Sequence, residues 1–331
     1  MINKFISFIK QNGLPQPTDN CTIVLAISGG IDSVVMLDLF NEAGYKFVIA
    51  HANFQLRGND SDLDQFFVQK LSQKYNTIFF TKKFDTINYA KQNHLSIQMA
   101  ARELRLKWFF ELCEQYNFPY VATAHHRDDQ VETFMINLIR GADFKSLSGI
   151  KPVSGKIIHP LLFATKQNII EYATKKQLTH REDISNQSDK YLRNKIRHNL
   201  LPLMEQIYPG AINSIILATQ KISDTYEIIN SNVEKESKQC ISKYNGFTEI
   251  DIDKLLKLKP LRLYLHEFIK PYGFNYETTI KIIAAIKKNP GKLFFSTSHQ
   301  LLIDRNKIII YTKNNITNNI DEKILINANT S

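Results

Sequence analysis

Residues 28–33, Ser-Gly-Gly-Ile-Asp-Ser, contain the residue types that a phosphate site needs. They lie between a short apolar run and the start of a helical pattern, where the unpaired N–H groups of the first helical turn attract anions. The glycines let the backbone approach an anion closely, the serines add hydroxyl donors, and the aspartate can hold a magnesium ion. A plain strand-to-helix turn is the alternative. The predicted nucleotide-binding residues of this loop are Ser28, Gly29, Gly30, Ile31, Asp32 and Ser33.

The spacing of this motif separates it from two widespread phosphate loops. It does not read GxxxxGK[ST], which disfavours a GTPase or a motor-type ATPase. It also differs from GxGxxG followed by a ribose-binding acid, which disfavours a dinucleotide-binding protein. The motif therefore indicates a nucleotide site of another class.

A second group of polar residues follows the next predicted strand, in the segment 51–58 (HANFQLRG). Parallel strands end at the same edge of a sheet, so this segment is expected close to the glycine loop. We expect His51 and Asn53 to meet a nucleobase or ribose, and Arg57 to meet phosphate. A histidine after a strand also occurs as an ordinary structural residue, and that alternative stays open.

The segment 123–133 (TAHHRDDQVET) contains two histidines, an arginine and three acidic residues. The helix dipole stabilises acidic residues at the start of a helix, and this capping role accounts for one of the three acidic residues. The others predict a catalytic group, in which an aspartate supports a metal or orients a nucleophile and a histidine handles protons or contacts a nucleotide. The candidate catalytic residues of this segment are His125, Asp128 and Asp129.

Arg102 and Arg105 stand three residues apart in the segment 99–108 (MAARELRLKW), so they share one helical face. A guanidinium binds a carboxylate or a phosphate through two parallel hydrogen bonds. The pair is a further catalytic candidate, for stabilising charge or holding a carboxylate, if that face lines the cleft. A solvated basic face is the alternative.

The first half of the chain alternates predicted strands with predicted helices. The strands are expected at 22–27, 46–51, 77–81 and 119–124, and the helices at 32–43, 60–75, 96–117 and 128–140. This alternation predicts an α/β fold, with a parallel sheet flanked by helices and ligands at the carboxyl ends of the strands.

The second half has a different pattern. Helices are expected at 165–176, 190–207, 252–270 and 276–288, a long polar helix at 211–238, and short strands at 293–296, 300–303 and 307–312. We therefore predict three parts: a catalytic domain over residues 1–210, a helical connector over 211–239, and a small α+β domain over 240–331.

Composition narrows the class of protein further. The 331 residues include 42 Lys and Arg against 32 Asp and Glu, a formal charge of +10 that favours a polyanionic partner. Biased amino-acid usage explains the surplus equally well. The three scattered cysteines form no CxxC pair, which argues against a disulfide framework and a zinc site. With neither a signal-peptide pattern nor a stretch of membrane-span length, we predict a soluble protein of the cytoplasm that binds no membrane.

Several motifs together resemble those of the tRNA(Ile)-lysidine synthase family. SGGIDS resembles the pyrophosphate loop, or PP-loop, of the N-type ATP pyrophosphatases, and residues 182–203 (EDISNQSDKYLRNKIRHNLLPL) are similar to an Asp-x-Ser-Asn turn followed by an RNxIRxxLLP helix. The resemblance covers most of residues 20–210 and, more weakly, the C-terminal part, which implies a short two-module form. Two positions depart from the pattern: Phe54, where a histidine is frequent, and His159, where an arginine commonly precedes Pro-Leu-Leu.

The resemblance implies a Rossmann-like PP-loop ATPase fold and a ligase that forms a carbon–nitrogen bond. In this family ATP adenylates the wobble cytidine of tRNA(Ile) with a CAU anticodon, and L-lysine then displaces AMP to form lysidine. It also implies Mg²⁺ bound by Asp32 and Asp129, and a homodimer as one available assembly. The tRNA contacts that it implies are Arg193, Lys195 and Arg197.

Two other functions compete with this one. A tRNA 2-thiocytidine synthetase-like enzyme shares the loop and a similar HHRDD segment, but its chemistry needs paired cysteines for an iron–sulfur cluster or a sulfur relay. A non-catalytic tRNA-binding protein with a degenerate ATP site belongs to a different class. The intact Asp32, Ser33, Asp128 and Asp129 argue against it.

Overall fold

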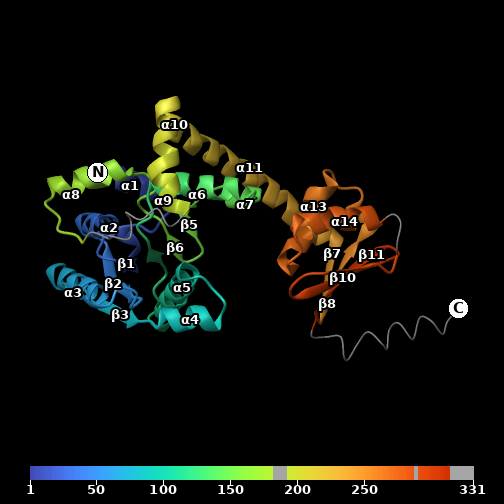
Figure 1. Ribbon diagram of the computed structural model, residues 1–331, viewed down its shortest axis with the longest axis horizontal. Coiled ribbons are helices and arrows are strands. Elements are labelled where there is room, and N and C mark those ends of the chain that lie inside the picture. The colour runs from blue at the N-terminus through green and yellow to red at the C-terminus, as the bar shows by residue number, and fades with distance from the viewer. Residues whose placement is uncertain (182–191, 287–289, 314–331) are drawn as a thin grey trace. The chain divides into compact units, whose positions relative to one another are not determined.

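The computed structural model describes residues 1–181, 192–286 and 290–313. The chain divides into two compact units, Met1–Ser223 and Asp224–Ser331, and the boundary falls within the long helix α11 (Ala211–Cys240; Figure 1). The predicted Asp-x-Ser-Asn turn at 183–186 lies outside the described residues.

The first unit is built on a six-stranded sheet in the order β3-β2-β1-β4-β6-β5. Its neighbouring strands are parallel except for the β5–β6 pair. This confirms the predicted α/β class with a parallel sheet. The strands are β1 (Thr22–Ala26), β2 (Lys46–Asn53), β3 (Phe79–Lys83), β4 (Val121–Ala122), β5 (Val153–Ser154) and β6 (Ile157–Ile158).

Helices cover both faces of this sheet (Figure 1). Side chains of β1 alternate between the faces: Ile23 and Leu25 join a core with α1, α2 and α8, whereas Val24 joins a core with α5. The helices of the unit are α1 (Ile2–Gln11), α2 (Ile31–Glu42), α3 (Asn59–Lys74), α4 (Thr86–Gln92), α5 (Ile97–Gln115), α6 (Arg127–Ile139), α7 (Phe144–Leu147), α8 (Lys166–Lys175), α9 (Leu192–Lys195) and α10 (Leu201–Ile207).

A separate apolar cluster joins helices at the end of the first unit. Val131 and Phe134 of α6 pack with Ile196, which lies in a π-helical turn over Ile196–Leu200 between α9 and α10, and with Ile216 of α11. This packing fixes α9 and α10 against α6. The residues of α9 and α10 therefore lie against α6, the helix that begins within the segment 123–133.

The order of the strands places the loops that follow β1 and β4 together. From β1 the chain passes to β2 on one side, and β4 lies against the other side of β1. The carboxyl ends of β1 and β4 therefore flank a topological switch point, where ligands bind in open α/β sheets. Residues 27–30 lead from β1 into α2, and residues 123–126 lead from β4 into α6.

The second unit contains an antiparallel sheet in the order β7-β8-β11-β10-β9. Its core includes Leu265 and Phe268 from α13, Ile282 from α14, and Ile308 and Ile310 from β11. The elements are β7 (Ile241–Tyr244), β8 (Phe247–Asp251), α12 (Ile252–Leu255), α13 (Leu261–Ile269), α14 (Tyr276–Ile286), β9 (Leu293–Phe295), β10 (His299–Asp304) and β11 (Lys307–Thr312). The predicted α+β character is confirmed.

Several predicted elements differ from the structure. The single helix expected at 252–270 is two helices, α12 and α13, because Pro260 has no N–H to continue the helical hydrogen bonding. The strand expected at 119–124 is reduced to the two residues of β4. Strands β7 and β8, which flank a turn at residues 245–246, were not predicted, nor was the short β5–β6 pair.

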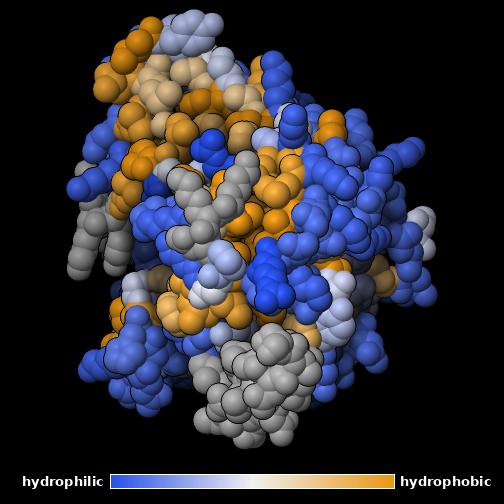
Figure 2. Space-filling model, turned by 90° about the vertical axis from the view of Figure 1, so that its right-hand side faces the viewer, coloured by the Kyte–Doolittle hydropathy of each residue, from blue (hydrophilic) through white to orange (hydrophobic). Residues whose placement is uncertain are grey.

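The surface of the molecule is mixed in polarity. On the face shown in Figure 2, broad hydrophilic areas are interrupted by patches of hydrophobic residues. Within the residues that the structure describes, no helix has both the length and the apolar character that crossing a bilayer requires.

Candidate active site

The glycine loop forms a tight bend between β1 and α2. Gly29 has φ +96°, and a Cβ at this position would lie 3.3 Å from the ring of Phe67, so only glycine fits without strain. The loop amides donate to the hydroxyls beside them: Gly29 N–H to Ser33 Oγ at 3.2 Å, and Gly30 N–H to Ser28 Oγ at 3.3 Å. Hydroxyl oxygens thus occupy the position where an anionic oxygen could accept the same hydrogen bonds.

Asp32, in the first turn of α2, is paired with a lysine that the sequence did not single out. Lys166 Nζ donates to Asp32 Oδ1 at 2.5 Å, although 134 positions separate the two residues. The backbone N–H of Lys166 donates to Asp128 at 2.8 Å. The start of α8 therefore links Asp32 of the glycine loop to Asp128 of the segment 123–133.

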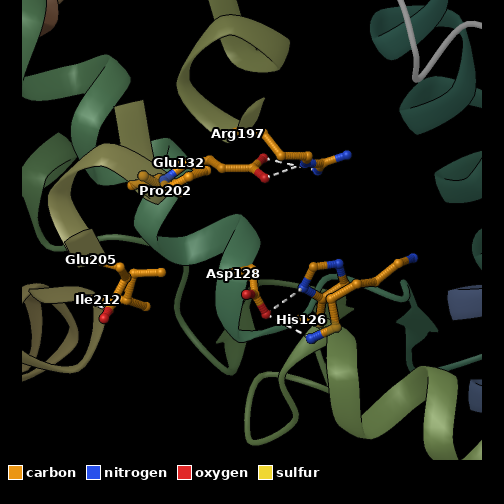
Figure 3. Close-up of a pocket in the computed structure, with 9 residues that line it drawn as sticks. His126, Asp128, Glu132, Arg197, Pro202, Glu205 and Ile212 are labelled. Atoms are coloured by element: carbon orange, nitrogen blue, oxygen red, sulfur yellow. Dashed lines mark hydrogen bonds and ion pairs between the residues drawn. The ribbon is translucent and has the colours of Figure 1, made fainter. Parts of the chain in front are cut away.

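His126 lies at the centre of three carboxylates. Its Nδ1 is 3.4 Å from Asp128, and its Nε2 is 3.5 Å from Asp129 and 3.9 Å from Asp32. Figure 3 shows Asp128 and His126 facing each other at the start of α6. Burial lowers the pKa of His126, but Asp128, Asp129 and Asp32 together outweigh it, so that the pKa is raised above its ordinary value. The imidazolium form is therefore stabilised by the acids around it.

His126 is also the N-cap residue of α6. The carboxylate of Asp129 accepts a hydrogen bond from the backbone N–H of His126 at 3.0 Å, in a capping-box arrangement. One of the two aspartates thus serves as a helix cap, as its position at the helix start indicated. Capping does not prevent a second role, because Asp129 also lies beside the His126 ring.

His125 has a different environment from its neighbour. Its Nδ1 lies 2.9 Å from Thr123 Oγ1, and its ring packs edge-on against His159 at 5.0 Å. Loss of hydration lowers the pKa of His125 to about 3, and the nearby cations of Arg105 and Arg193 act in the same direction. His125 is therefore neutral at physiological pH and is a poor proton donor there. Its neighbour His126, which was not among the predicted catalytic residues, is better suited to exchange protons.

Arg105 turns from α5 toward these histidines rather than toward solvent. Its Nε atom is buried, and it has no hydrogen-bond partner among the residues that the structure describes. Burial lowers the pKa of Arg105, and the positive charge of Arg102 adds to that effect. A buried donor without a partner is costly, so this guanidinium is suited to an anionic ligand.

Glu132 holds two of the predicted tRNA-binding residues. Its side chain is 1% exposed and pairs with Arg193 Nε at 2.9 Å. It also pairs with Arg197 Nε at 2.5 Å, as Figure 3 shows. Arg197 also lies 3.6 Å from Asp129. Arg193 and Arg197 therefore direct their charge toward α6 instead of forming a free basic face with Lys195, which is exposed.

A pocket of about 230 Å³ opens beside this network. Charged groups and apolar side chains line it together (Figure 3), a combination that suits a small ligand with one polar and one apolar part. The lining residues are His126, Asp128, Glu132, Lys166, Arg197, Leu201, Pro202, Glu205 and Ile212.

The structure does not bring His51 and Asn53 into this cluster. His51 is buried, and its Nδ1 lies 2.9 Å from the carbonyl oxygen of Ile27. The Asn53 amide donates to Asp62 and Gln65, each at 3.0 Å. Both side chains are engaged in holding the ends of strands and α3 together, and this geometry offers no support for the expected contact with a nucleobase or ribose.

The acids of the site suit a magnesium ion shared with a nucleotide. Asp32 and Asp129 flank the same ring nitrogen of His126, so their carboxylates face one small region. Magnesium is commonly held by one or two carboxylates, with phosphate and water oxygens completing its coordination. No group of three or more His, Cys, Asp or Glu residues that could form a metal cage occurs in the described parts of the chain.

The glycine loop at the switch point of a parallel sheet, facing an acidic helix start, defines a PP-loop nucleotide-binding protein. Residues 3–204 match the family model described as PP-loop domain, and residues 242–313 match the one described as TilS substrate binding domain. The chain belongs to the tRNA(Ile)-lysidine synthase family.

Curated relatives support this assignment over most of the chain. The tRNA(Ile)-lysidine synthase of Bacteroides thetaiotaomicron is 39% identical over 93% of this chain and 71% of its own length. That of Parabacteroides distasonis is 39% identical over 87% of this chain and 65% of its own length. The chain thus spans about two thirds of the length of these relatives.

A solved structure shares the fold. The U34-tRNA thiolase NcsA from Methanococcus maripaludis, with its [4Fe-4S] cluster, has a TM-score of 0.55 and 19% identity, covering 67% of this chain and 78% of its own. At this level of identity the likeness extends to the fold alone.

Proposed function

We propose that this protein is a cytoplasmic ligase that uses ATP to convert the wobble cytidine of tRNA(Ile) with a CAU anticodon into lysidine. The observation that carries the proposal is the meeting of Asp32, from the glycine loop, with Asp128 and Asp129 around His126 at the switch point of the sheet. Family membership supplies the substrate class, and the cluster supplies groups for phosphate, metal and amine.

The reaction consists of two displacements. The carbonyl oxygen at position 2 of the cytosine attacks the α-phosphorus of ATP, and the bond to the bridging oxygen breaks, so that pyrophosphate leaves. The ε-amine of lysine then attacks carbon 2, and AMP leaves with its oxygen. A free lysine amine has a pKa of about 10.4, so it must lose a proton before it can attack. Asp128 and Asp129 are the candidates for accepting that proton, and His126 can pass it on.

Asp32 and Asp129 would hold the magnesium ion, which neutralises charge on the phosphates when it is bound. Lys166 now neutralises Asp32 at 2.5 Å. Nucleotide binding would replace this contact, because the phosphates bring both the ion and a new partner for the lysine. The loop residues Ser28 to Ser33 would receive the pyrophosphate part of ATP.

The arginines of α5 would bind the carboxylate of substrate lysine or stabilise charge during adenylation. Support comes from the buried and unpaired Nε of Arg105. Neutral His125, beside this arginine, would accept or donate a hydrogen bond to the nucleotide rather than carry a proton. Arg102, on the same helical face, would add positive charge.

Binding of tRNA would use both units. The second unit corresponds to the substrate-binding domain of the family and presents exposed cations such as Arg262 and Lys281. In the first unit, exposed Lys195 would contact phosphate, while Arg193 and Arg197 would act through their pairing with Glu132. A homodimer, one assembly that the family resemblance implies, would be compatible with this scheme.

Mass analysis of nucleosides tests the proposal directly. Isoleucine tRNA with a CAU anticodon is incubated with the protein, ATP and isotopically labelled lysine, then digested. We expect labelled lysidine in the tRNA and equal amounts of AMP and pyrophosphate in solution. Formation of ADP and phosphate, or tRNA without label, would refute the proposed reaction.

Asp32→Ala tests the role of the loop acid. We expect lysidine formation to fall by roughly a thousand-fold or more, because metal and phosphate charge lose a partner at the reacting centre. Affinity for tRNA should stay near that of the wild type, since Asp32 lies in the nucleotide loop. A parallel collapse of tRNA affinity would show that Asp32 is structural.

A further inference from the structure

Two arginines from distant parts of the sequence share one buried carboxylate next to the glycine loop. Arg57 Nη2 lies 2.5 Å from one oxygen of Asp64, and Arg181 Nε pairs with the other oxygen. The Asp64 side chain is 10% exposed, whereas those of Arg57 and Arg181 are 39% and 34% exposed. One carboxylate thus holds two guanidinium groups, and both remain partly accessible.

Backbone and packing contacts place this cluster beside the loop. The N–H of Arg181 donates to the carbonyl oxygen of Gly29 at 3.0 Å. Asp64 precedes Phe67 and Val68 by three and four positions, so all three lie on one face of α3. Atoms of Phe67 and Val68 come within 3.3 and 3.5 Å of the position that a Gly29 Cβ would take. The face of α3 that carries Asp64 is therefore the face that packs on the glycine loop.

We propose that Arg57 and Arg181 form a clamp for the β- and γ-phosphates of ATP and stabilise the departing pyrophosphate. This inference rests on the proposed use of ATP. When the bond between the α-phosphorus and the bridging oxygen breaks, its electron pair passes to the pyrophosphate, whose negative charge grows. A planar guanidinium matches two phosphate oxygens, and its charge is most effective where new charge develops. Asp64 accepts a hydrogen bond from each guanidinium group and so holds both beside the loop.

Calorimetric binding of inorganic pyrophosphate, ATP and AMP, each with magnesium chloride, tests the clamp on the whole protein. In Arg181→Met and Arg57→Met we expect the Kd for pyrophosphate and for ATP to rise roughly ten- to a hundred-fold, because each variant loses one charge-assisted contact with phosphate. The Kd for AMP should stay unchanged, because AMP lacks the β- and γ-phosphates. Lys70→Met is the matched control. It removes one positive charge from the exposed face of α3, the helix that carries Asp64, and should leave all three Kd values unchanged.

A purely structural role for the two arginines predicts different results. If Arg181→Met weakens AMP and pyrophosphate equally, or leaves pyrophosphate binding unaltered, the clamp is wrong. Asp64→Asn keeps both arginines and should retain the pyrophosphate affinity within a few-fold even if its melting temperature falls. Loss of pyrophosphate binding in Asp64→Asn to the same extent as in Arg181→Met would also overturn the proposal.

The clamp and the proposed reaction can fail separately. Pyrophosphate binding to the wild type needs neither tRNA nor lysine, so it can depend on Arg181 even if no lysidine forms. Conversely, lysidine formation by the wild type combined with unchanged pyrophosphate affinity in Arg181→Met would leave the reaction standing and remove the clamp.

Discussion

The two units of the chain differ in whether their charged side chains are buried or exposed. The first unit buries His126, Asp64 and Glu132 and surrounds them with charged partners. In the described part of the second unit, the buried polar residues are Thr248 and Thr279. Its ion pair between Lys281 and Glu277 joins two side chains that are 62% and 73% exposed.

This difference shows which unit contains buried charge and therefore its free-energy cost. Removing a charge from water is expensive unless partners compensate it, and a hydrophobic residue would often be as stable in the same place. Charge is nevertheless buried around His126, at the switch point where a ligand is expected. The second unit follows the ordinary rule for a small domain, with an apolar core and charges outside. The proposed chemistry therefore lies in the first unit.

The largest effect is expected for Glu132→Ala. This change leaves Arg193 and Arg197 without their shared carboxylate; breaking a fully buried pair costs about 3–5 kcal/mol, and the cost here is smaller because solvent reaches both guanidinium groups, which are 41% and 35% exposed. Urea unfolding followed by the fluorescence of Trp108, the single tryptophan of the chain, reports the free energy of unfolding of the first unit. Glu132→Gln, which retains hydrogen-bond acceptors, should lose less.

Glu277→Ala provides the matching change in the second unit. It removes the partner of Lys281, and the two side chains are 73% and 62% exposed, so the thermal unfolding of this unit should change little. Circular dichroism measures the melting temperature. A loss of stability as large as that of Glu132→Ala would abolish the distinction between the two units.

A smaller and pH-dependent effect is expected for His125→Asn. The folded protein holds the pKa of His125 at about 3, whereas an unfolded histidine has a pKa of about 6.5. Below pH 6.5 the unfolded state binds a proton that the folded state rejects, so stability falls as the pH falls. The loss attributable to this residue is on the order of 2 kcal/mol at pH 5.

The variant should therefore lose less stability than the wild type between pH 6.5 and pH 4, while the difference between the two proteins at pH 8 serves as the reference. Urea unfolding at each pH, again followed by Trp108, gives the comparison. Parallel curves for the two proteins across this range would show that His125 protonates as readily in the folded state as in the unfolded state.

The smallest effects are expected for exposed cations, one from each unit. Lys195→Ala and Arg262→Ala should each weaken tRNA binding by a few-fold and reduce the slope of log K against log salt by about one. Filter binding at several salt concentrations measures both. Lys91→Ala, an exposed lysine of α4, is the control. A change confined to Arg262→Ala would assign phosphate contact to the second unit alone.

Local patterns in the sequence determined much of this protein. The glycine loop could be predicted because a strand, two glycines and a helix start are contiguous, and each acts through its nearest neighbours. The alternation of apolar runs with helical periods predicted the parallel sheet, and the order of motifs predicted the family. The weaker predictions concern short strands such as β4, whose pairing with β1 depends on a partner far away in the sequence rather than on its own residues.

Tertiary structure alone decided which charged groups meet. Lys166 reaches Asp32 across 134 positions, and Arg197 reaches Glu132 across 65. The pKa of His125 is lowered mainly by burial, with nearby arginines adding to it, whereas three carboxylates outweigh burial and raise the pKa of the adjacent His126. The Asn53 amide donates to Asp62 and Gln65, which spacing along the chain did not predict. The strength of an ionic contact depends on distance and burial in space, and spacing along the chain carries neither quantity.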